Sequence, residues 1–171
     1  SQGTSILKVF SLTAASTGNN ERTLKQLGIN YHVAIVHPNS HATYYPGSQP
    51  LTIKLLFDDS GRILGAQSVG LEGVDKRIDV IATVIRLKGT VSDLTELELA
   101  YAPPYSSAKD PVNMVGFVAE NILSGLCDAF TYDQLASFSP EETILLDVRT
   151  ETEFANGYLP GALNIPVDEL R

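Results

Sequence analysis

Alternating apolar and polar residues mark much of the first part of the chain as β-strand. In residues 51–57, LTIKLLF, every second residue is apolar, which places four large side chains on one face of an extended strand. The next four residues, DDSG, form a hairpin turn, and residues 62–70 return as the following strand. Shorter runs of this kind occupy residues 6–10 and 31–38. We therefore predict a mainly antiparallel sheet.

Helical spacing of apolar residues replaces this alternation after residue 70. Residues 74–88 repeat apolar side chains every three or four positions on two stripes, and Gly89 ends the run, so we predict a helix covered on more than one side. Lys76 is expected to pair with Glu72, four residues earlier. Arg77 is expected at the exposed or interface edge of this helix.

A second long helix is predicted after a loop rich in tyrosine and proline. Asp110 is a good N-cap, Pro111 suits the first helical position, and Gly125 ends the segment. Shorter helices are predicted within residues 16–29, with Asn19 or Asn20 as the cap and Gly28 at the end, and within residues 90–98. Strands followed by helices predict an α+β fold, with helices packed on the mainly antiparallel sheet.

The pattern changes again after residue 125. Residues 143–148, TILLDV, form a nearly continuous apolar run of the kind buried in a parallel sheet, and helical and strand-like segments alternate around it. We therefore predict two parts: residues 1–125 as one α+β domain, and residues 126–171 as an incomplete, truncated α/β segment. The chain starts and stops within elements, so we expect it to be cut from a longer protein.

Charge and cysteine content restrict the partners. The net charge is −8 and the sequence pI is about 4.7, which argues against nucleic acid or an anionic membrane surface as partner. A single cysteine, Cys127, excludes an internal disulfide framework and favours a reducing, cytoplasmic setting. No apolar run has the length of a membrane span.

Residues with catalytic or metal-binding chemistry are few. His37 and His41 stand in HPNSH, where the proline prevents a shared helix face, and no cluster of further ligands accompanies them, so no metal site is expected. No glycine-rich phosphate loop and no GxSxG motif occur. Ser106 has no base beside it in the sequence, and Cys127 is interpreted as a linker or packing thiol.

The tyrosines are the better candidates. Tyr44 and Tyr45 stand in one predicted loop, and Tyr101 and Tyr105 flank a Pro-Pro pair in another. A phenol with a pKa near 10 acts at neutral pH as a donor or acid and could orient or protonate a departing sulfur. Tyrosine is also common at interfaces, where one end of the ring is apolar and the other wet, and the residues alone favour that simpler interpretation.

Four motifs together resemble a known family. They are ILKVFSLTAASTGNNERTLKQLGINY, HPNSHATYYPG, LLFDDSGRILGAQSVGLEGVDKRIDVIATVI and LTELELAYAPPYSSAKDPVNMVGFVAENIL. In order, they are similar to the C-terminal dimerisation domain of FAD-dependent pyridine nucleotide-disulfide oxidoreductases, in the branch of coenzyme A-disulfide reductase, NADH oxidase and persulfide reductase. The last part, LLDVRTETEFANGYLPGALNIPVDELR, resembles the first half of a rhodanese domain.

The resemblance implies a parent enzyme that is larger than this chain. FAD and NAD(P)H domains would precede Ser1. They would contain a reactive cysteine, and the substrate of the enzyme would be coenzyme A disulfide or persulfide. The cysteine of a rhodanese domain would follow Arg171. The chain would provide the homodimer interface, and the backbone at Ala102 and Pro103 would line the partner subunit's flavin. By itself, the chain is expected to bind no cofactor and to be inactive.

The resemblance also assigns the tyrosines. Tyr44 and Tyr101 match the two residues that approach the partner subunit's reactive cysteine. Tyr45 and Tyr105, which stand close to them in the sequence, are expected to bind substrate and could exchange roles with them. In the rhodanese-like part, Asp147 and Arg149 match a motif that mostly braces the fold. Three points stay open: the substrate of the parent, the choice between NADH and NADPH, and the function of the rhodanese half.

Two alternatives stand beside this hypothesis. The chain could be a non-catalytic dimerising module that presents a sulfur-carrier domain, with its tyrosines serving only in packing. The parent could instead be an NADH oxidase that reduces oxygen, and Tyr105 alone does not distinguish that reaction from disulfide reduction.

Overall fold

The structure, a computed structural model, describes residues 2–139 and 141–170. The chain divides into two compact units, one extending to Ala129 and one beginning at Phe130, and each is described by itself. The elements of the first unit are β1 (Ser5–Val9), β2 (Leu12–Gly18), α1 (Glu21–Leu27), β3 (His32–Val36), β4 (Leu51–Phe57), β5 (Ile63–Gly70), α2 (Val74–Arg86), α3 (Val91–Glu96) and α4 (Pro111–Leu123).

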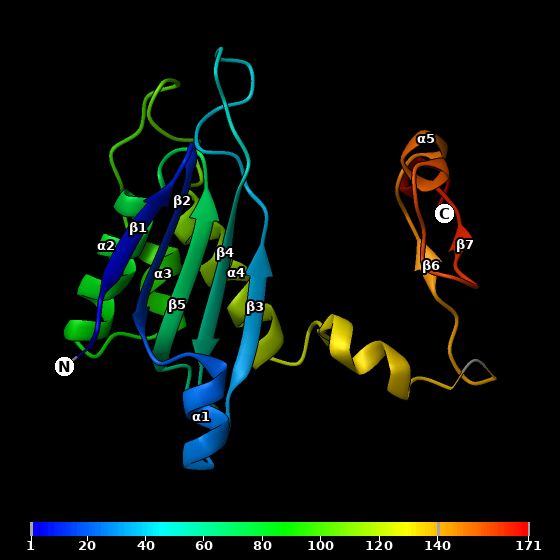
Figure 1. The fold of residues 1–171 in the computed structure, drawn as a ribbon, viewed down its shortest axis with the longest axis horizontal. Helices are drawn as coiled ribbons and strands as arrows, with labels where there is room; N and C mark the ends of the chain where they lie inside the picture. Colours follow the sequence, from blue (N-terminus) through cyan, green and yellow to red (C-terminus); the bar gives the residue numbers. More distant parts are fainter. Residues whose placement is uncertain (1, 140, 171) are drawn as a thin grey trace. The chain divides into compact units, whose positions relative to one another are not determined.

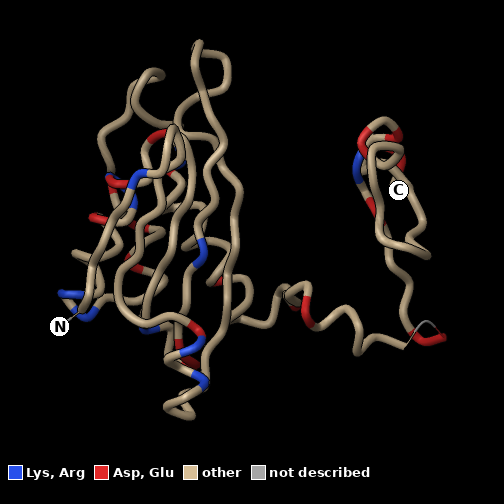
Figure 2. The backbone as a smooth tube through the Cα atoms, viewed as in Figure 1, with Lys and Arg blue, Asp and Glu red and all other residues tan. Residues whose placement is uncertain are grey.

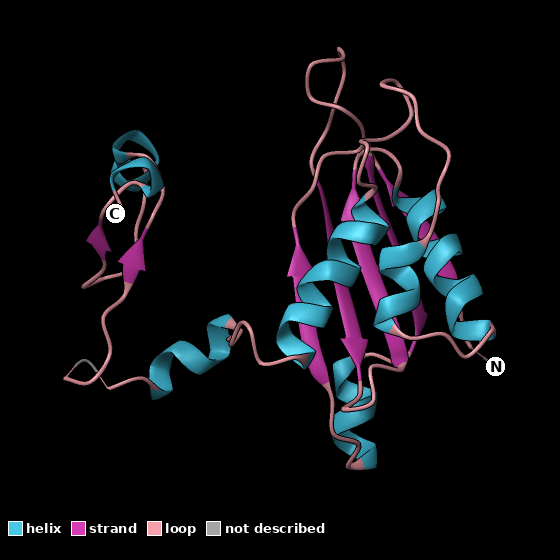
Figure 3. Ribbon diagram, turned by 180° about the vertical axis from the view of Figure 1, so that it is seen from behind, coloured by secondary structure: helices cyan, strands magenta, loops and turns pink. Residues whose placement is uncertain are grey.

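The first unit is a five-stranded sheet with helices on one face. The strand order is β1-β2-β5-β4-β3, and each neighbouring pair is antiparallel. The view from behind shows α2, α3 and α4 on the same face of the sheet (Figure 3), while α1 lies at one end of the sheet (Figure 1). The predicted α+β class is confirmed.

The core lies between the sheet and these helices. The alternation in β4 places one set of apolar side chains on one face, as predicted, and these side chains join the core that α2 and α4 also line. The fully buried members of this core include Leu51, Ile53, Leu55, Phe57, Val74, Ile78, Ile81, Val91, Leu94, Val112 and Val115. Leu56 points to the opposite face, where it packs with Leu24 of α1 and Leu64 of β5. Leu87, predicted to continue the second stripe of α2, is instead exposed.

Local signals set the helix ends as predicted. The side chain of Asn20 accepts a hydrogen bond from the Thr23 amide at the start of α1, and Gly28 ends that helix with a φ of 63°. At the start of α4, the side chain of Asp110 accepts from the Val112 amide, and Pro111 occupies the first turn.

Strand β2 is the element that the sequence pattern did not predict. Residues 16–18, placed at the start of the first helical segment, instead belong to a strand that pairs with β1 on one side and β5 on the other. Its residues, LTAASTG, are mostly small, so no alternation of large apolar side chains marks it. Close packing explains the small residues, since a Cβ at Gly18 would lie 2.5 Å from the Leu64 carbonyl oxygen.

The second unit contains short elements. They are η1 (Tyr132–Ser137) and η2 (Val167–Glu169), both 3₁₀-helices, α5 (Glu151–Ala155), and the strands β6 (Leu146–Asp147) and β7 (Leu163–Asn164). The strands pair in parallel, in keeping with an α/β segment. The expectation of a long buried strand at residues 143–148 is wrong for this unit: the ladder covers two residues, and Ile144 is 82% exposed. None of residues 143–148 is buried.

Two long loops leave the same end of the sheet in the first unit (Figure 1). Tyrosine loop 1, residues 37–50, joins β3 to β4, and tyrosine loop 2, residues 97–110, joins α3 to α4. The amide of Ala42 in loop 1 donates to the carbonyl of Ser106 in loop 2 at 3.1 Å. The two loops are therefore hydrogen-bonded to each other, although about sixty residues separate them in sequence.

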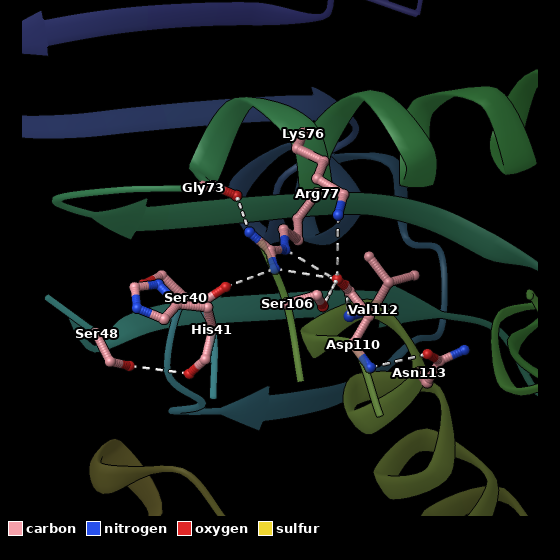
Figure 4. Close-up of polar contacts among 10 residues, drawn as sticks. All are labelled: Ser40, His41, Ser48, Gly73, Lys76, Arg77, Ser106, Asp110, Val112 and Asn113. Atoms are coloured by element: carbon pink, nitrogen blue, oxygen red, sulfur yellow. Dashed lines mark hydrogen bonds and ion pairs between the residues drawn. The ribbon is translucent and has the colours of Figure 1, made fainter. Parts of the chain in front are cut away.

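A buried ion pair lies under both loops (Figure 4). The Arg77 side chain is 2% exposed, and its Nε and Nη2 donate to Asp110 Oδ1 and Oδ2 at 3.3 and 3.0 Å. The prediction that Arg77 lies at an exposed edge of the helix is wrong. Lys76 also faces Asp110, with Nζ 3.7 Å from Oδ2, in place of the predicted pair with Glu72. The carboxylate of Asp110, at the N-terminus of α4, attracts both Lys76 and Arg77.

Asp110 is stabilised in its charged form. Burial raises the pKa of Asp110, but hydrogen bonds from the Ser106 hydroxyl and the Val112 amide, together with the charge of Arg77, outweigh burial and lower that pKa. A carboxyl whose pKa is lower in the folded protein than in the unfolded chain adds stability above its unfolded pKa. That stability is lost as the pH falls through the folded pKa.

We predict that Asp110→Asn lowers the free energy of unfolding of this chain by about 3 kcal/mol at pH 7, because Arg77 keeps a buried charge without its counter-ion. Asparagine caps a helix as well as aspartate, so the loss reports the charge and not the cap. The difference from the native chain should begin to narrow below about pH 4, where Asp110 takes up a proton in the unfolded chain, and should narrow further as the pH falls toward the lower pKa of the folded protein. Urea denaturation at pH 7 and pH 3 measures both values.

The control for this prediction is Asp79→Asn, on the exposed side of α2. It should change the free energy of unfolding by less than about 0.5 kcal/mol. A deficit in Asp110→Asn that stays constant from pH 7 to pH 3 would contradict the assigned charge state.

We also predict that Gly116→Ala destabilises the chain, although alanine is the better helix former by about 1 kcal/mol. A Cβ at this position in α4 would lie 2.9 Å from Leu94 Cβ and 3.1 Å from Thr95 Cγ2, which would push α3 away. Thermal unfolding followed by circular dichroism measures the change, and a raised melting temperature would show that α3 adjusts without cost.

Candidate functional site

Tyr44 and Tyr101 meet at the exposed ends of the two tyrosine loops. Their hydroxyl oxygens are 3.0 Å apart, a hydrogen-bond distance, although 57 positions separate the residues in sequence. The side chains are 75% and 48% exposed, so the shared hydroxyls are accessible from outside the unit. The structure thus brings together the two tyrosines that the family resemblance assigns to catalysis.

The two other tyrosines stand beside this pair. The ring of Tyr45 packs edge-on against His41, with ring centres 5.9 Å apart, and its amide donates to the Ala42 carbonyl, which closes a turn. Tyr45 is 43% exposed and Tyr105 is 71% exposed, so both rings add to the accessible surface near the loop ends. Neither is part of the Tyr44–Tyr101 hydrogen bond.

Ala102 and Pro103 shape the end of loop 2. The Ala102 carbonyl accepts hydrogen bonds from the amides of Tyr105 and Ser106, at 2.9 and 3.2 Å, so the chain turns back sharply at this point. That carbonyl is already engaged, and Pro103 has no amide hydrogen. A ligand at this turn would therefore meet an apolar wall made by a methyl group and a proline ring.

The electrostatic surroundings of the pair are neutral. Residues 38–50 and 99–108 contain no Lys, Arg, Asp or Glu, and the outer ends of both loops are free of charged positions (Figure 2). The hydrogen bond with Tyr101 raises the pKa of Tyr44 above its usual range near 10. The Tyr44 phenol therefore stays protonated at neutral pH. In this pair one hydroxyl proton lies between the two oxygens, and the other can point to a ligand.

Sequence reasoning missed the groups below the tyrosines. The Ser106 hydroxyl donates to Asp110 Oδ2 at 2.6 Å, so this serine does have a carboxylate nearby, four residues away, but it is 1% exposed and unsuited to attack a substrate. A signal for Arg77 was present: position 77 lies three residues after Val74 and four before Ile81, on the buried stripe of α2.

The histidines and the cysteine considered in the sequence analysis show no arrangement of a catalytic or metal-binding site among the described residues. His41 lies between the Ser40 hydroxyl and the Pro46 carbonyl, and His37 contacts the Thr52 hydroxyl at 2.9 Å. Cys127 is an exposed free thiol. Within residues 2–139 and 141–170, no group of three or more His, Cys, Asp or Glu side chains could hold a metal ion. No helix in the same residues is long and apolar enough to cross a membrane.

In the second unit, Asp147 and Arg149 form a local brace. Two side-chain nitrogens of Arg149 donate to the carboxylate of Asp147, the shorter bond being 2.6 Å, and Nη2 also donates to the Gly157 carbonyl. The hydrogen bonds from Arg149 lower the pKa of Asp147. These contacts join the end of β6 to the loop after α5.

Two family models match the chain. Residues 4–111 match the pyridine nucleotide-disulphide oxidoreductase dimerisation domain. Residues 131–171 match the rhodanese-like domain. The order of the two matches is the order of the two compact units.

Relatives and solved structures agree with these matches. The chain is 48% identical over 119 residues to a coenzyme A disulfide reductase of Staphylococcus aureus (strain bovine RF122 / ET3-1), covering 69% of this chain and 27% of that protein. The crystal structure of reduced CoADR-RHD from Bacillus anthracis has 54% identity and a TM-score of 0.96, covering 99% of this chain and 31% of that one. A NAD-dependent persulfide reductase from A. fulgidus has 41% identity and a TM-score of 0.87, covering 98% and 30%.

The chain thus spans about a third or less of the length of these relatives. The dimerisation-domain match alone covers more than half of the chain, and the antiparallel sheet with its two tyrosine loops lies almost wholly within it. The chain belongs to the pyridine nucleotide-disulphide oxidoreductase dimerisation-domain family and continues into a rhodanese-like segment.

Proposed function

We propose that this chain completes the active site of a partner subunit in an FAD- and NAD(P)H-dependent coenzyme A-disulfide or persulfide reductase. The observation that carries the proposal is the hydrogen bond between the exposed hydroxyls of Tyr44 and Tyr101. Similarity to a coenzyme A disulfide reductase and to a persulfide reductase supports the substrate class. The dimer would be a symmetric homodimer, in which each subunit gives to and receives from the other. Helices α2 and α4 would help to build its interface.

FAD bound by the upstream domains would supply the hydride chemistry, accepting from NAD(P)H and reducing the disulfide. The tyrosines of this chain supply a proton donor. When a disulfide is reduced, the departing sulfur gains negative charge, and a hydroxyl within hydrogen-bond distance stabilises it or protonates it. The phenol of Tyr44, with its raised pKa, stays protonated at neutral pH, as this role requires. Tyr45 and Tyr105 would contact the substrate, and Ala102 and Pro103 would present an apolar wall to the partner's flavin.

The cellular setting in this proposal is the cytoplasm. Cys127 is the single cysteine and an exposed free thiol, which suits a reducing compartment. Cofactors would bind the upstream domains, so no cofactor is assigned to this chain alone.

An alternative function has one observation in its favour. The tyrosine side chains are exposed, Tyr44 by 75%, as expected for rings that only pack in a subunit interface. The chain would then be a dimerising module that presents the rhodanese-like segment, and the hydroxyls would be dispensable. Removing a single hydroxyl separates the two functions.

We predict that Tyr101→Phe in the full-length protein slows disulfide reduction about a hundred-fold, the lower range of a lost proton donor. Reduction of the flavin by NAD(P)H should stay within about two-fold of the native rate, because that step does not use this hydroxyl. Stopped-flow absorbance of the flavin measures both half-reactions, with coenzyme A disulfide, coenzyme A persulfide and oxygen as separate oxidants. Tyr132→Phe, in the second unit, is the matched control. Equal losses in both half-reactions, or no loss, would overturn the role.

Action across the interface has its own test. A Tyr101→Phe subunit that keeps the reactive cysteine is mixed with a subunit that lacks this cysteine but keeps Tyr101. Each mixed dimer then contains one complete site, and random mixing should restore about a quarter of native activity. Recovery no greater than that of the separate variants would show that Tyr101 serves its own subunit.

A further inference from the structure

The two tyrosine loops share one buried anchor. Arg77 Nη2 donates to the Ser40 carbonyl of loop 1 at 2.8 Å and to Asp110 Oδ2 at 3.0 Å. The same Oδ2 accepts from the Ser106 hydroxyl of loop 2. Ser40 precedes Tyr44 by four residues, and Ser106 follows Tyr101 by five. Figure 4 shows the guanidinium of Arg77 between the two loop segments.

We propose that Arg77 and Asp110 are positioning residues that fix the distance between the Tyr44 and Tyr101 hydroxyls. The inference rests on the proposed function for its effect on catalysis, but its geometric part stands without it. Neither residue touches the phenols; each acts by holding the base of a loop. The pair therefore governs where the proton donor stands.

The shape of the guanidinium explains why arginine occupies this place. Its nitrogen donors lie in one plane with fixed directions, so a single group serves the Ser40 carbonyl, the Asp110 carboxylate and, through Nη1, the Gly73 carbonyl at 3.2 Å. A lysine ammonium has the same charge but only one nitrogen. It can neutralise Asp110 without holding both loops at the same spacing.

Capping of α4 does not account for these contacts. The cap uses Asp110 Oδ1, which accepts from the Val112 amide. The second oxygen, Oδ2, accepts from the Ser106 hydroxyl and from Arg77 Nη2, and Arg77 Nε also donates to Oδ1. An aspartate serving only as a cap would need neither a buried arginine nor a buried serine. Among the additional contacts, Ser106 belongs to loop 2 and Arg77 reaches loop 1 through the Ser40 carbonyl, while Lys76 adds a second cation from α2.

Burial makes the anchor stiff, whereas the hydroxyls that it positions are exposed. Ser40, Arg77, Ser106 and Asp110 are each 3% exposed or less, so water competes little for their hydrogen bonds. The Ala42–Ser106 backbone hydrogen bond joins the two loops to each other next to the anchor. The phenols lie beyond it, at 75% and 48% exposure, where little packing holds them.

The test is Arg77→Lys in the full-length protein, with Arg62→Lys as matched control. Arg62 also pairs with an aspartate, Asp58, but it is exposed in the β4–β5 turn, at the opposite end of the sheet from the loops. Arg77→Lys should slow disulfide reduction ten- to about a hundred-fold, as a misplaced donor does, and leave flavin reduction by NAD(P)H unchanged. Arg62→Lys should change neither rate.

A double-mutant cycle separates positioning from general damage. In a Tyr101→Phe background, Arg77→Lys should slow disulfide reduction by less than about two-fold, because the donor that it positions is already absent. Full additivity of the two effects would overturn the proposal. Ser106→Ala is the second variant if Arg77→Lys folds poorly. It keeps the ion pair and the cap but removes the side-chain hydrogen bond between Ser106 and Asp110, and it should show the same dependence on Tyr101.

A spectroscopic readout distinguishes failure of the inference from failure of the proposed function. With ¹³Cζ-labelled tyrosine, NMR follows the ionisation of Tyr44, identified by its absence in Tyr44→Phe. Separation of the hydroxyls in Arg77→Lys should bring the raised pKa of Tyr44 back toward its ordinary value. An unchanged Tyr44 titration overturns positioning even if Tyr101→Phe slows catalysis. A shifted titration supports positioning even if Tyr101→Phe leaves disulfide reduction intact, in which case the proposed function fails alone.

Discussion

The ion pair between Arg77 and Asp110 is the interaction on which the arrangement of the two tyrosine loops depends. Placing two charges inside a protein costs several kcal/mol for each ion, and attraction between them offsets that cost only when further hydrogen bonds satisfy the remaining donors and acceptors. Here the further partners are the Ser40 and Gly73 carbonyls, the Ser106 hydroxyl and the Val112 amide. The burial of the pair is therefore tied to the conformation of both loops, and a change in either loop leaves a buried charge poorly solvated.

Much of the fold could be predicted from the sequence because its signals are local. The alternation in β4, the caps at Asn20 and Asp110 and the stop at Gly28 each involve residues a few positions apart, and the structure has them as expected. Strand β2 escaped prediction because its small residues are required by neighbours on other strands, and such contacts leave no periodic pattern. The short ladder of β6 has a similar cause, since burial of an apolar run depends on what packs against it.

In the site, too, features set by neighbouring residues could be predicted, whereas contacts between residues far apart in sequence could not. Each tyrosine loop could be identified from composition, and family resemblance selected Tyr44 and Tyr101 among four candidates. Their hydrogen bond could not be derived from the residues alone, because it depends on two loops 57 positions apart. Arg77 was placed on an exposed edge by its charge, although its position on the helix pointed inward. The interpretation gave more weight to the charge of Arg77 than to its spacing, because the counter-ion, Asp110, lies 33 residues away and is not part of the local pattern.

The neutral, exposed ends of the loops and the buried pair of Arg77 and Asp110 have different roles. The anchor determines where a side chain is presented, and the ends of the loops determine which chemical group is presented there. An exchange at position 101 or 105 changes that group without disturbing the helices or the sheet. A fold built in this way can acquire new chemistry by point substitution. The ends of the loops can change during evolution because the buried ion pair holds the bases of the loops in place.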